Sequence, residues 1–143
     1  MIRVYDLMSE QTVTVGAAEP VTAAARLMRQ YNIGAVPVCD DAGKLLGMVT
    51  DRDIVIRCTA LGKSGGRTAV GDIMSRSLVT VDEKAHISEA AHLMAEKQVR
   101  RLPVCRDGKL VGMLSLGDLA RSTDCDTEAA AALSEISRNV RRV

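Results

Sequence analysis

Residues 43–50 read GKLLGMVT, and residues 108–115 read GKLVGMLS. The two stretches lie 108 − 43 = 65 positions apart and differ only by conservative exchanges. At an offset of 70 − 4 = 66, two further stretches repeat upstream: VYDLMS at 4–9 returns as VGDIMS at 70–75, and VPVC at 36–39 returns as LPVC at 102–105. The chain therefore contains two copies of one unit of roughly 50 residues.

Each copy has the pattern of a β-α-β-β-α unit. In the first copy, Val13–Val15 indicates a short strand, and the apolar residues of Val21–Tyr31 recur at helical spacing. Residues 35–39 and 45–50 then indicate a hairpin. A second helix is expected after Thr50, and the second copy runs likewise from residue 79 to about 121.

These patterns predict an α+β fold of two tandem repeats packed sheet to sheet with pseudo-two-fold symmetry, followed by a C-terminal helix. The expected boundaries are 1–61 for the first repeat, 62–69 for a Gly/Ser-rich linker, 70–123 for the second repeat and 124–143 for the helix. Apolar residues of that helix recur at heptad spacing: Ala129, Leu133, Ile136, Val140 and Val143. Such a seam either docks on the protein's own body or forms a dimer contact.

Composition narrows the classes of function. The chain has 143 residues, of which 47% are hydrophobic and 26% charged, and its net charge of +1 gives no basis for binding nucleic acid. The apolar runs are too short to cross a membrane, and Met1–Arg3 leads into mixed polar sequence without a signal peptide, which predicts a cytoplasmic protein. Phe and Trp are absent, so a flat ligand would lie against aliphatic side chains and backbone.

No motif of a familiar catalytic class occurs, and we predict that the protein is not an enzyme. His86 and His92 are six positions apart and would point to different sides of a helix, so we predict no metal site. A small enzyme that uses the Cys39 thiol is an alternative. Because Cys39 and Cys105 occupy equivalent strand positions and no base is evident, core packing is favoured for both.

A hydroxyl-x-x-Asp motif stands in both copies where a strand is expected to become a helix, as Thr50 to Asp53 and as Ser115 to Asp118. One interpretation is a helix cap, in which the hydroxyl and the carboxylate each accept a backbone N–H. The other is a ligand site, since a helix start with a free hydroxyl binds phosphate and a carboxylate accepts hydrogen bonds from ribose hydroxyls. Both interpretations remain open from the residues alone.

The strand that opens each hairpin differs between the copies. Gly34-Ala35-Val36-Pro37 offers close backbone approach, whereas Arg100-Arg101-Leu102-Pro103 brings positive charge. In the first copy a positive charge comes instead from Arg52, beside the Thr50 hydroxyl. These arginines are either solvated surface or ligands for an anion.

Together, the order, spacing and duplication of these motifs resemble CBS domains paired as a Bateman module, and the chain is similar to small stand-alone bacterial CBS-pair proteins of the hypoxic-response type. The resemblance implies two pseudo-symmetric clefts between the repeats that hold an adenosine nucleotide. By position it assigns the ribose to Asp53 and Asp118 and the phosphate to Thr50 and Ser115. The residues that it places around the base are Ala35, Val36, Arg101 and Leu102.

The resulting hypothesis is a non-catalytic regulatory module that binds AMP, ADP, ATP or a related adenosyl ligand. It would need no obligatory cofactor, would form a homodimer and would signal to a separate effector protein. The alternative is a ligand-free protein-protein interaction module, in which the two hydroxyl-x-x-Asp motifs are only helix caps.

Overall fold

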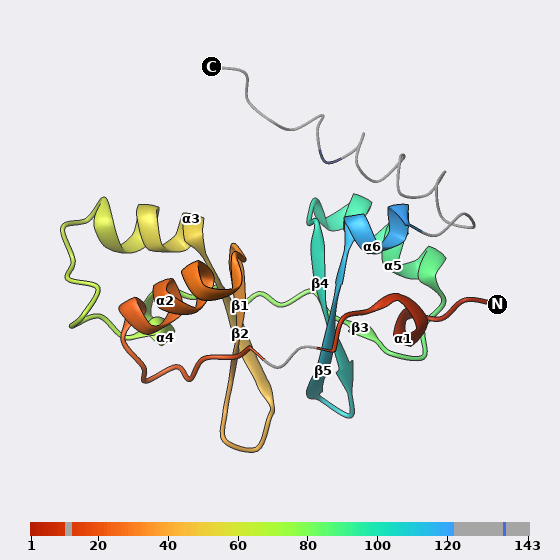
Figure 1. Ribbon diagram of the computed structural model, residues 1–143, viewed down its shortest axis with the longest axis horizontal. Helices are drawn as coiled ribbons and strands as arrows, with labels where there is room; N and C mark the ends of the chain where they lie inside the picture. Colours follow the sequence, from red (N-terminus) through yellow and green to blue (C-terminus); the bar gives the residue numbers. More distant parts are fainter. Residues whose placement is uncertain (11–12, 122–135, 137–143) are drawn as a thin grey trace. The chain divides into compact units, whose positions relative to one another are not determined.

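The computed structural model describes residues 1–10, 13–121 and 136 of the chain (Figure 1). It confirms the mixed α+β fold. The elements in chain order are α1 (Val4–Leu7), α2 (Val21–Tyr31), β1 (Ala35–Cys39), β2 (Leu45–Thr50), α3 (Asp51–Ile54), the π-helix η1 (Val55–Thr59), α4 (Val70–Ile73), β3 (Val81–Asp82), α5 (Ile87–Lys97), β4 (Arg101–Arg106), β5 (Lys109–Ser115) and α6 (Leu116–Ala120).

The first repeat centres on the β1–β2 hairpin, and helices α2, α3 and α4 contact its strands (Figure 1). Helix α2 has the bounds that the apolar periodicity predicted, and it ends at Asn32, whose φ of 52° is the left-handed conformation of a helix C-cap. The hairpin turn forms as expected, because the Asp40 carboxylate accepts the N–H groups of Ala42 and Lys44. The strand expected over Val13–Val15 is shorter than predicted: only Val15 bridges β1.

The second repeat has the strand order β3-β4-β5. Strand β3 runs parallel to β4, with Val81 opposite Val104, and helix α5 contacts β4 and α6. Helix α5 ends like its counterpart in the first repeat, at a left-handed residue, Gln98 with φ 58°. The repeated sequence therefore ends the first long helix of each repeat in the same conformation.

Compact packing units and sequence repeats divide the chain differently. One unit combines Met1–Gln11, Val79–Asp107 and Val111–Val143, and the other combines Thr12–Leu78 and Gly108–Leu110. The N-terminal segment thus packs with the second repeat, where the N–H of Val4 donates to the carbonyl of Ala85 at 2.9 Å. Residues 70–75 pack with the first repeat in the same way, through the N–H of Val70 and the carbonyl of Glu19 at 2.8 Å. The repeats have exchanged their leading segments.

Two equivalent glycines lie under the exchanged segments. Met48 and Ser75 exchange two backbone hydrogen bonds of 3.0 and 2.8 Å, and a Cβ on the neighbouring Gly47 would lie 2.7 Å from the Ser75 carbonyl oxygen. In the second repeat, a Cβ on Gly112 would lie 2.7 Å from both the Ser9 carbonyl oxygen and the Met8 sulfur. The glycine of the repeated GKLxGM stretch therefore allows the backbone of the exchanged segment to cross its strand.

An ion pair between the buried carboxylate of Glu83 and the exposed side chain of Arg106 fixes the loop that receives the N-terminal segment. Glu83 is 6% exposed, and its carboxylate accepts hydrogen bonds from Arg106 Nε at 2.6 Å and Nη2 at 2.8 Å. The Glu83 carbonyl accepts the Tyr5 N–H at 2.9 Å. The hydrogen bond from Arg106 lowers the pKa of Glu83 below its ordinary value, against the opposing effect of burial.

Each unit has its own aliphatic core. The core of the first repeat includes Val36, Val38 and Val49, and that of the second includes Leu102, Val104 and Leu114, all fully buried. Most of the expected C-terminal helix, including Leu133, lies outside the described residues. Ile136 is described, and it is helical and buried, as its place in the predicted seam requires.

Candidate functional site

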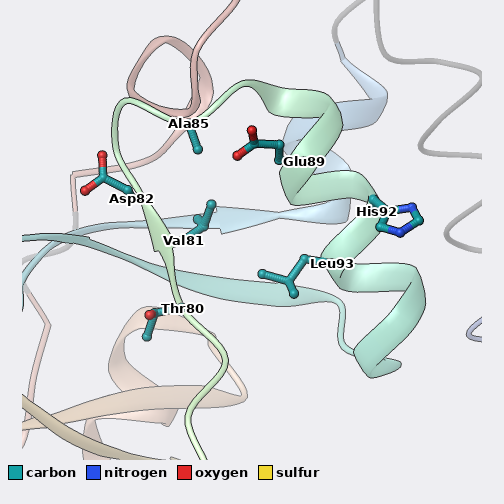
Figure 2. A pocket seen from close by; sticks show the side chains of 7 residues that line it. All are labelled: Thr80, Val81, Asp82, Ala85, Glu89, His92 and Leu93. Atoms are coloured by element: carbon teal, nitrogen blue, oxygen red, sulfur yellow. The ribbon is translucent and has the colours of Figure 1, made fainter.

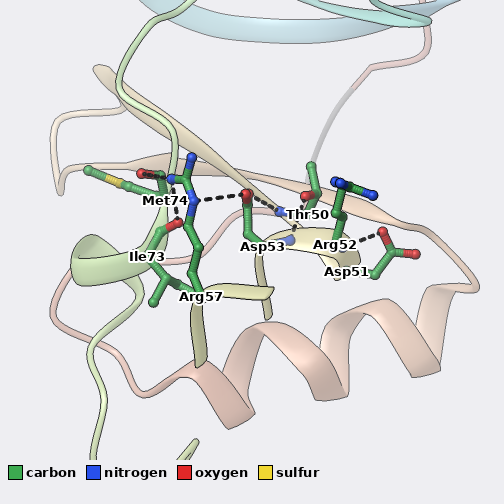
Figure 3. A network of polar contacts seen from close by, with 7 residues as sticks. All are labelled: Thr50, Asp51, Arg52, Asp53, Arg57, Ile73 and Met74. Atoms are coloured by element: carbon green, nitrogen blue, oxygen red, sulfur yellow. Dashed lines mark hydrogen bonds and ion pairs between the residues drawn. The ribbon is translucent and has the colours of Figure 1, made fainter. Parts of the chain in front are cut away.

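The hydroxyl-x-x-Asp motif of the first repeat begins helix α3 directly after strand β2. The Asp53 N–H donates to the Thr50 hydroxyl oxygen at 3.1 Å, and the Thr50 N–H donates to Asp53 Oδ2 at 2.9 Å (Figure 3). The motif of the second repeat forms the same reciprocal bonds at the start of α6, with Asp118 N–H to Ser115 Oγ at 3.1 Å and Ser115 N–H to Asp118 Oδ2 at 2.8 Å. Both motifs are complete capping boxes.

The second oxygen of each carboxylate faces an arginine. Arg57 Nε lies 3.8 Å from Asp53 Oδ1, while its Nη1 donates to the carbonyls of Ile73 at 3.2 Å and Met74 at 3.5 Å (Figure 3). In the second repeat, Arg121 Nη2 bonds directly to Asp118 Oδ1. The Asp53 side chain is 15% exposed and the Asp118 side chain 6%.

Sequence reasoning missed both arginines. Arg57 follows Asp53 by four positions, a spacing that brings oppositely charged side chains together on a helix and could have been noticed. Arg121 follows Asp118 by three positions, so the two arginines do not occupy equivalent places in the repeats. The two sites therefore differ in the arginine that faces the carboxylate, although their hydroxyl-x-x-Asp motifs are the same.

The opening strand and the capping motif are neighbours within each repeat. Ala35 pairs with Thr50 across the β1–β2 hairpin, and the Gly34 carbonyl accepts the Asp51 N–H at 2.9 Å. In the second repeat the Arg100 carbonyl accepts the Leu116 N–H at 2.8 Å. The structure thus brings the predicted base-contacting strand and the predicted ribose carboxylate to the same edge of each unit.

The predicted site residues on these strands face different ways. Val36 and Leu102 are fully buried in the cores of their units, so only their backbone atoms are available to a ligand. Arg52, Arg100 and Arg101 are exposed, and within the described ranges none of the three forms an ion pair. Their side chains are therefore accessible, which agrees both with solvated surface residues and with ligands for an anion.

Gly34 allows close approach of the chain's own carboxylate. A Cβ at this position would lie 3.1 Å from Asp51 Oδ2. The backbone amides at the start of α3 are already used: Asp51 N–H by Gly34, Arg52 N–H by Asp51 Oδ1 at 2.8 Å, and Asp53 N–H by Thr50. A phosphate at this site would therefore meet engaged donors and the negative charge of Asp51. The second repeat has neutral Leu116 in place of Asp51.

A separate hollow of about 370 Å³ lies in the second repeat, between β3 and α5 (Figure 2). Its lining includes none of the predicted site residues and is mostly apolar, with Asp82, Glu89 and His92 as its acidic and imidazole groups. The residues that line it are Thr80, Val81, Asp82, Ala85, Glu89, His92 and Leu93.

The described thiols lie in packed surroundings. Cys58 is buried and its Sγ contacts the Lys63 carbonyl at 3.5 Å, while Cys39 and Cys105 are partly buried. Burial, with a smaller effect of the Asp82 charge, raises the pKa of Cys105, which disfavours the reactive thiolate. Among residues 1–10, 13–121 and 136, no group of three potential metal ligands gathers, and no helix is long and apolar enough to span a membrane.

Comparison with known proteins identifies the family. The model of the CBS domain family matches twice, at residues 4–58 and 70–123. The chain belongs to the CBS domain family. The CBS repeats also match the CBS domain-containing protein YhcV of Bacillus subtilis, which is 43% identical over 137 residues, 96% of each chain. Hypoxic response protein 1 of Mycobacterium tuberculosis is 42% identical over 121 residues, 85% of each chain.

Solved structures agree with this assignment. The chain is similar to hypoxic response protein I with two coordinated zinc ions, at a TM-score of 0.78 and 41% identity over 84% of this chain and 98% of that one. Two other CBS structures contain adenosine ligands. CBSX2 in complex with AMP matches at a TM-score of 0.74 and 31% identity, covering 85% and 95% of the two chains. The CBS domain pair of MJ0100, with 5′-methylthioadenosine and S-adenosylmethionine, matches at 0.74 and 27% identity, covering 84% and 98%.

Proposed function

We propose that this CBS pair is a non-catalytic regulatory module that binds an adenosine nucleotide or related adenosyl ligand. The observation that carries the proposal is the folded hydroxyl-x-x-Asp motif, present twice beside the strand predicted to contact the base. Similar CBS pairs bind AMP, 5′-methylthioadenosine and S-adenosylmethionine. The proposed ligand groups are Asp53 and Asp118 for the ribose and the Thr50 and Ser115 hydroxyls for phosphate.

Capping and ligand binding are compatible uses of the same carboxylate. In each box, Oδ2 accepts one backbone N–H, and a carboxylate oxygen can accept a second hydrogen bond. The Thr50 and Ser115 oxygens accept N–H groups, so their hydroxyl protons remain to be donated. A nucleotide can therefore be added to each motif without breaking its cap.

The two sites should differ in their preference for phosphate. The first has the Asp51 carboxylate near Gly34 and the Arg52 guanidinium in the same turn, whereas the second has Arg100 and Arg101 and no acidic counterpart of Asp51.

A ligand changes the output of a regulatory module only if it binds two conformations of the module with unequal affinity. A homodimer and a separate effector protein remain part of this proposal.

Calorimetric titration with adenosine, AMP, ADP, ATP, 5′-methylthioadenosine and S-adenosylmethionine tests the function. Asp53→Asn and Asp118→Asn each keep an oxygen for the cap and remove the charge that the ribose would use. Each should weaken its own site by about 1.5–3 kcal/mol, as expected for a lost charge-assisted hydrogen bond. Failure of every ligand to bind or to raise the melting temperature would refute the proposal.

The alternative is that the two motifs are helix caps only. The complete capping boxes agree with this alternative as well as they agree with a ligand site. In that case the asparagine variants would change stability alone, and the module would act through protein-protein contacts without a ligand. Measuring unfolding and binding on the same two variants separates the alternatives.

A further inference from the structure

We propose that Arg121 closes the ribose carboxylate of the second repeat, whereas the equivalent carboxylate of the first repeat stays open. This inference rests on the proposed adenosine binding and adds a residue that sets the affinity of one site. Arg121 lies outside the hydroxyl-x-x-Asp motif, and its competition with the ligand makes the two motifs unequal.

The first observation is which carboxylate atoms are already used. Oδ2 of Asp118 accepts the Ser115 N–H, whereas Oδ1 accepts no backbone N–H. Oδ1 instead accepts a hydrogen bond from Arg121 Nη2. Arg121 is 73% exposed, and within the described part of the chain this is the only bond of its guanidinium. A long, exposed side chain held at one point can swing away into solvent.

The first repeat holds its arginine differently. Arg57 is bound through Nη1 to two carbonyls at the end of helix α4, those of Ile73 and Met74. Because it is held there, its Nε remains 3.8 Å from Asp53 Oδ1, beyond hydrogen-bond length (Figure 3). The π-helix η1, which begins at Val55, carries Arg57 to this place. Asp53 is also the more exposed carboxylate of the two.

The energetic consequence is modest and has a definite sign. A ribose hydroxyl that donates to Asp118 Oδ1 competes with the Arg121 guanidinium for this oxygen. An ion pair with one exposed partner contributes little, so the competition should lower the affinity of this site about two- to fivefold. Removing the guanidinium should therefore strengthen ribose binding at Asp118. If Arg121 had no influence on the site, its removal would leave the affinity for the ligand unchanged.

The experiment isolates the second site with Asp53→Asn and compares it with Asp53→Asn, Arg121→Gln by titration with adenosine. Adenosine is the sharper probe because it has no phosphate, which Arg121 could also attract. The double variant should bind adenosine about two- to fivefold more tightly, with a smaller gain for AMP. Lys97→Gln in the same background removes a charge from the exposed end of α5 and should change nothing.

The complementary variant is Arg57→Gln in the Asp118→Asn background, which should give no gain in adenosine affinity. Unchanged or weaker binding after Arg121→Gln, or an equal gain from Lys97→Gln or Arg57→Gln, would overturn the role of Arg121 while leaving nucleotide binding intact. Binding by the wild type that is lost in both Asp53→Asn chains would do the same, because Asp118 would then bind no ribose. Absence of binding by every chain, the wild type included, would overturn the proposed function as well.

Discussion

Replacing Gly47 with alanine should destabilise the protein far more than a glycine-to-alanine change usually does. The new Cβ would lie 2.7 Å from the Ser75 carbonyl oxygen and 2.8 Å from the Met74 sulfur, both shorter than a van der Waals contact allows. The exchanged segment would have to move, and the two hydrogen bonds between Met48 and Ser75 would lengthen or break. The strand and the segment that crosses it would then separate.

The magnitude follows from these contacts. Overpacking costs about 1–3 kcal/mol, and each backbone hydrogen bond contributes about 1 kcal/mol net. Alanine recovers about 0.4–1 kcal/mol by restricting the unfolded chain. We therefore expect the free energy of unfolding to fall by about 2–4 kcal/mol, and Gly112→Ala, which meets Met8 and Ser9 at the same distance, to behave alike.

Urea unfolding followed by circular dichroism measures this change. Gly66→Ala is the matched control: Gly66 is exposed, and the nearest atom to its added Cβ lies 3.9 Å away, so its midpoint should stay constant or rise slightly. If Gly47→Ala unfolds at the same urea concentration as the wild type, the crossing of strand β2 by residues 74–75 is not tight and the reasoning is wrong.

Three further predictions follow from features described above. Arg106 lowers the pKa of Glu83 from 4.5, so the ionised pair stabilises the fold above that pH. This contribution is lost as the pH falls through the lower pKa of the folded state. Between about pH 7 and about pH 3, the urea midpoint should therefore fall more steeply for the wild type than for Glu83→Gln. Arg52→Ala should weaken the binding of AMP and ATP at the first site only, and alanine at both Arg100 and Arg101 should weaken it at the second site only. Both losses should be larger at low salt. If titrations at low and high salt show the same binding for these variants and the wild type, the arginines are solvated surface residues. Deleting residues 122–143 should lower the melting temperature or change the mass in light scattering, and no change in either would mean that the apolar seam is idle.

Local structure was largely predictable because it is encoded in local patterns. The helix at Val21–Tyr31 and the strands at 35–39 and 45–50 have their predicted bounds, since periodicity and turn residues specify them directly. The expected strand at Val13–Val15 shrank to one bridge at Val15. A stretch of three β-branched residues does not say how many of them pair.

The candidate site was predictable in its motifs and less so in its contacts. The repeated Thr50–Asp53 pattern located both capping boxes, but nothing in it revealed which side chains would reach the second carboxylate oxygen. Arg57, on the π-helix that follows α3, faces this oxygen at 3.8 Å, whereas Arg121 bonds to it from a different position in the repeat. Nor did sequence reasoning place Val36 inside the core, where its side chain cannot meet a ligand. These outcomes depend on tertiary packing.

The exchange of leading segments also affects the order in which the protein can be completed. Val4 leaves the ribosome well before its backbone partner Ala85, and Ser9 well before its partner Met113. During synthesis this segment must stay unpaired until residues 85–113 have emerged, so these contacts of large sequence separation form late. Neither half of the gene encodes a finished folding unit. Expressed alone, residues 1–61 would lack the segment that covers β2, and residues 70–123 the one that covers β5.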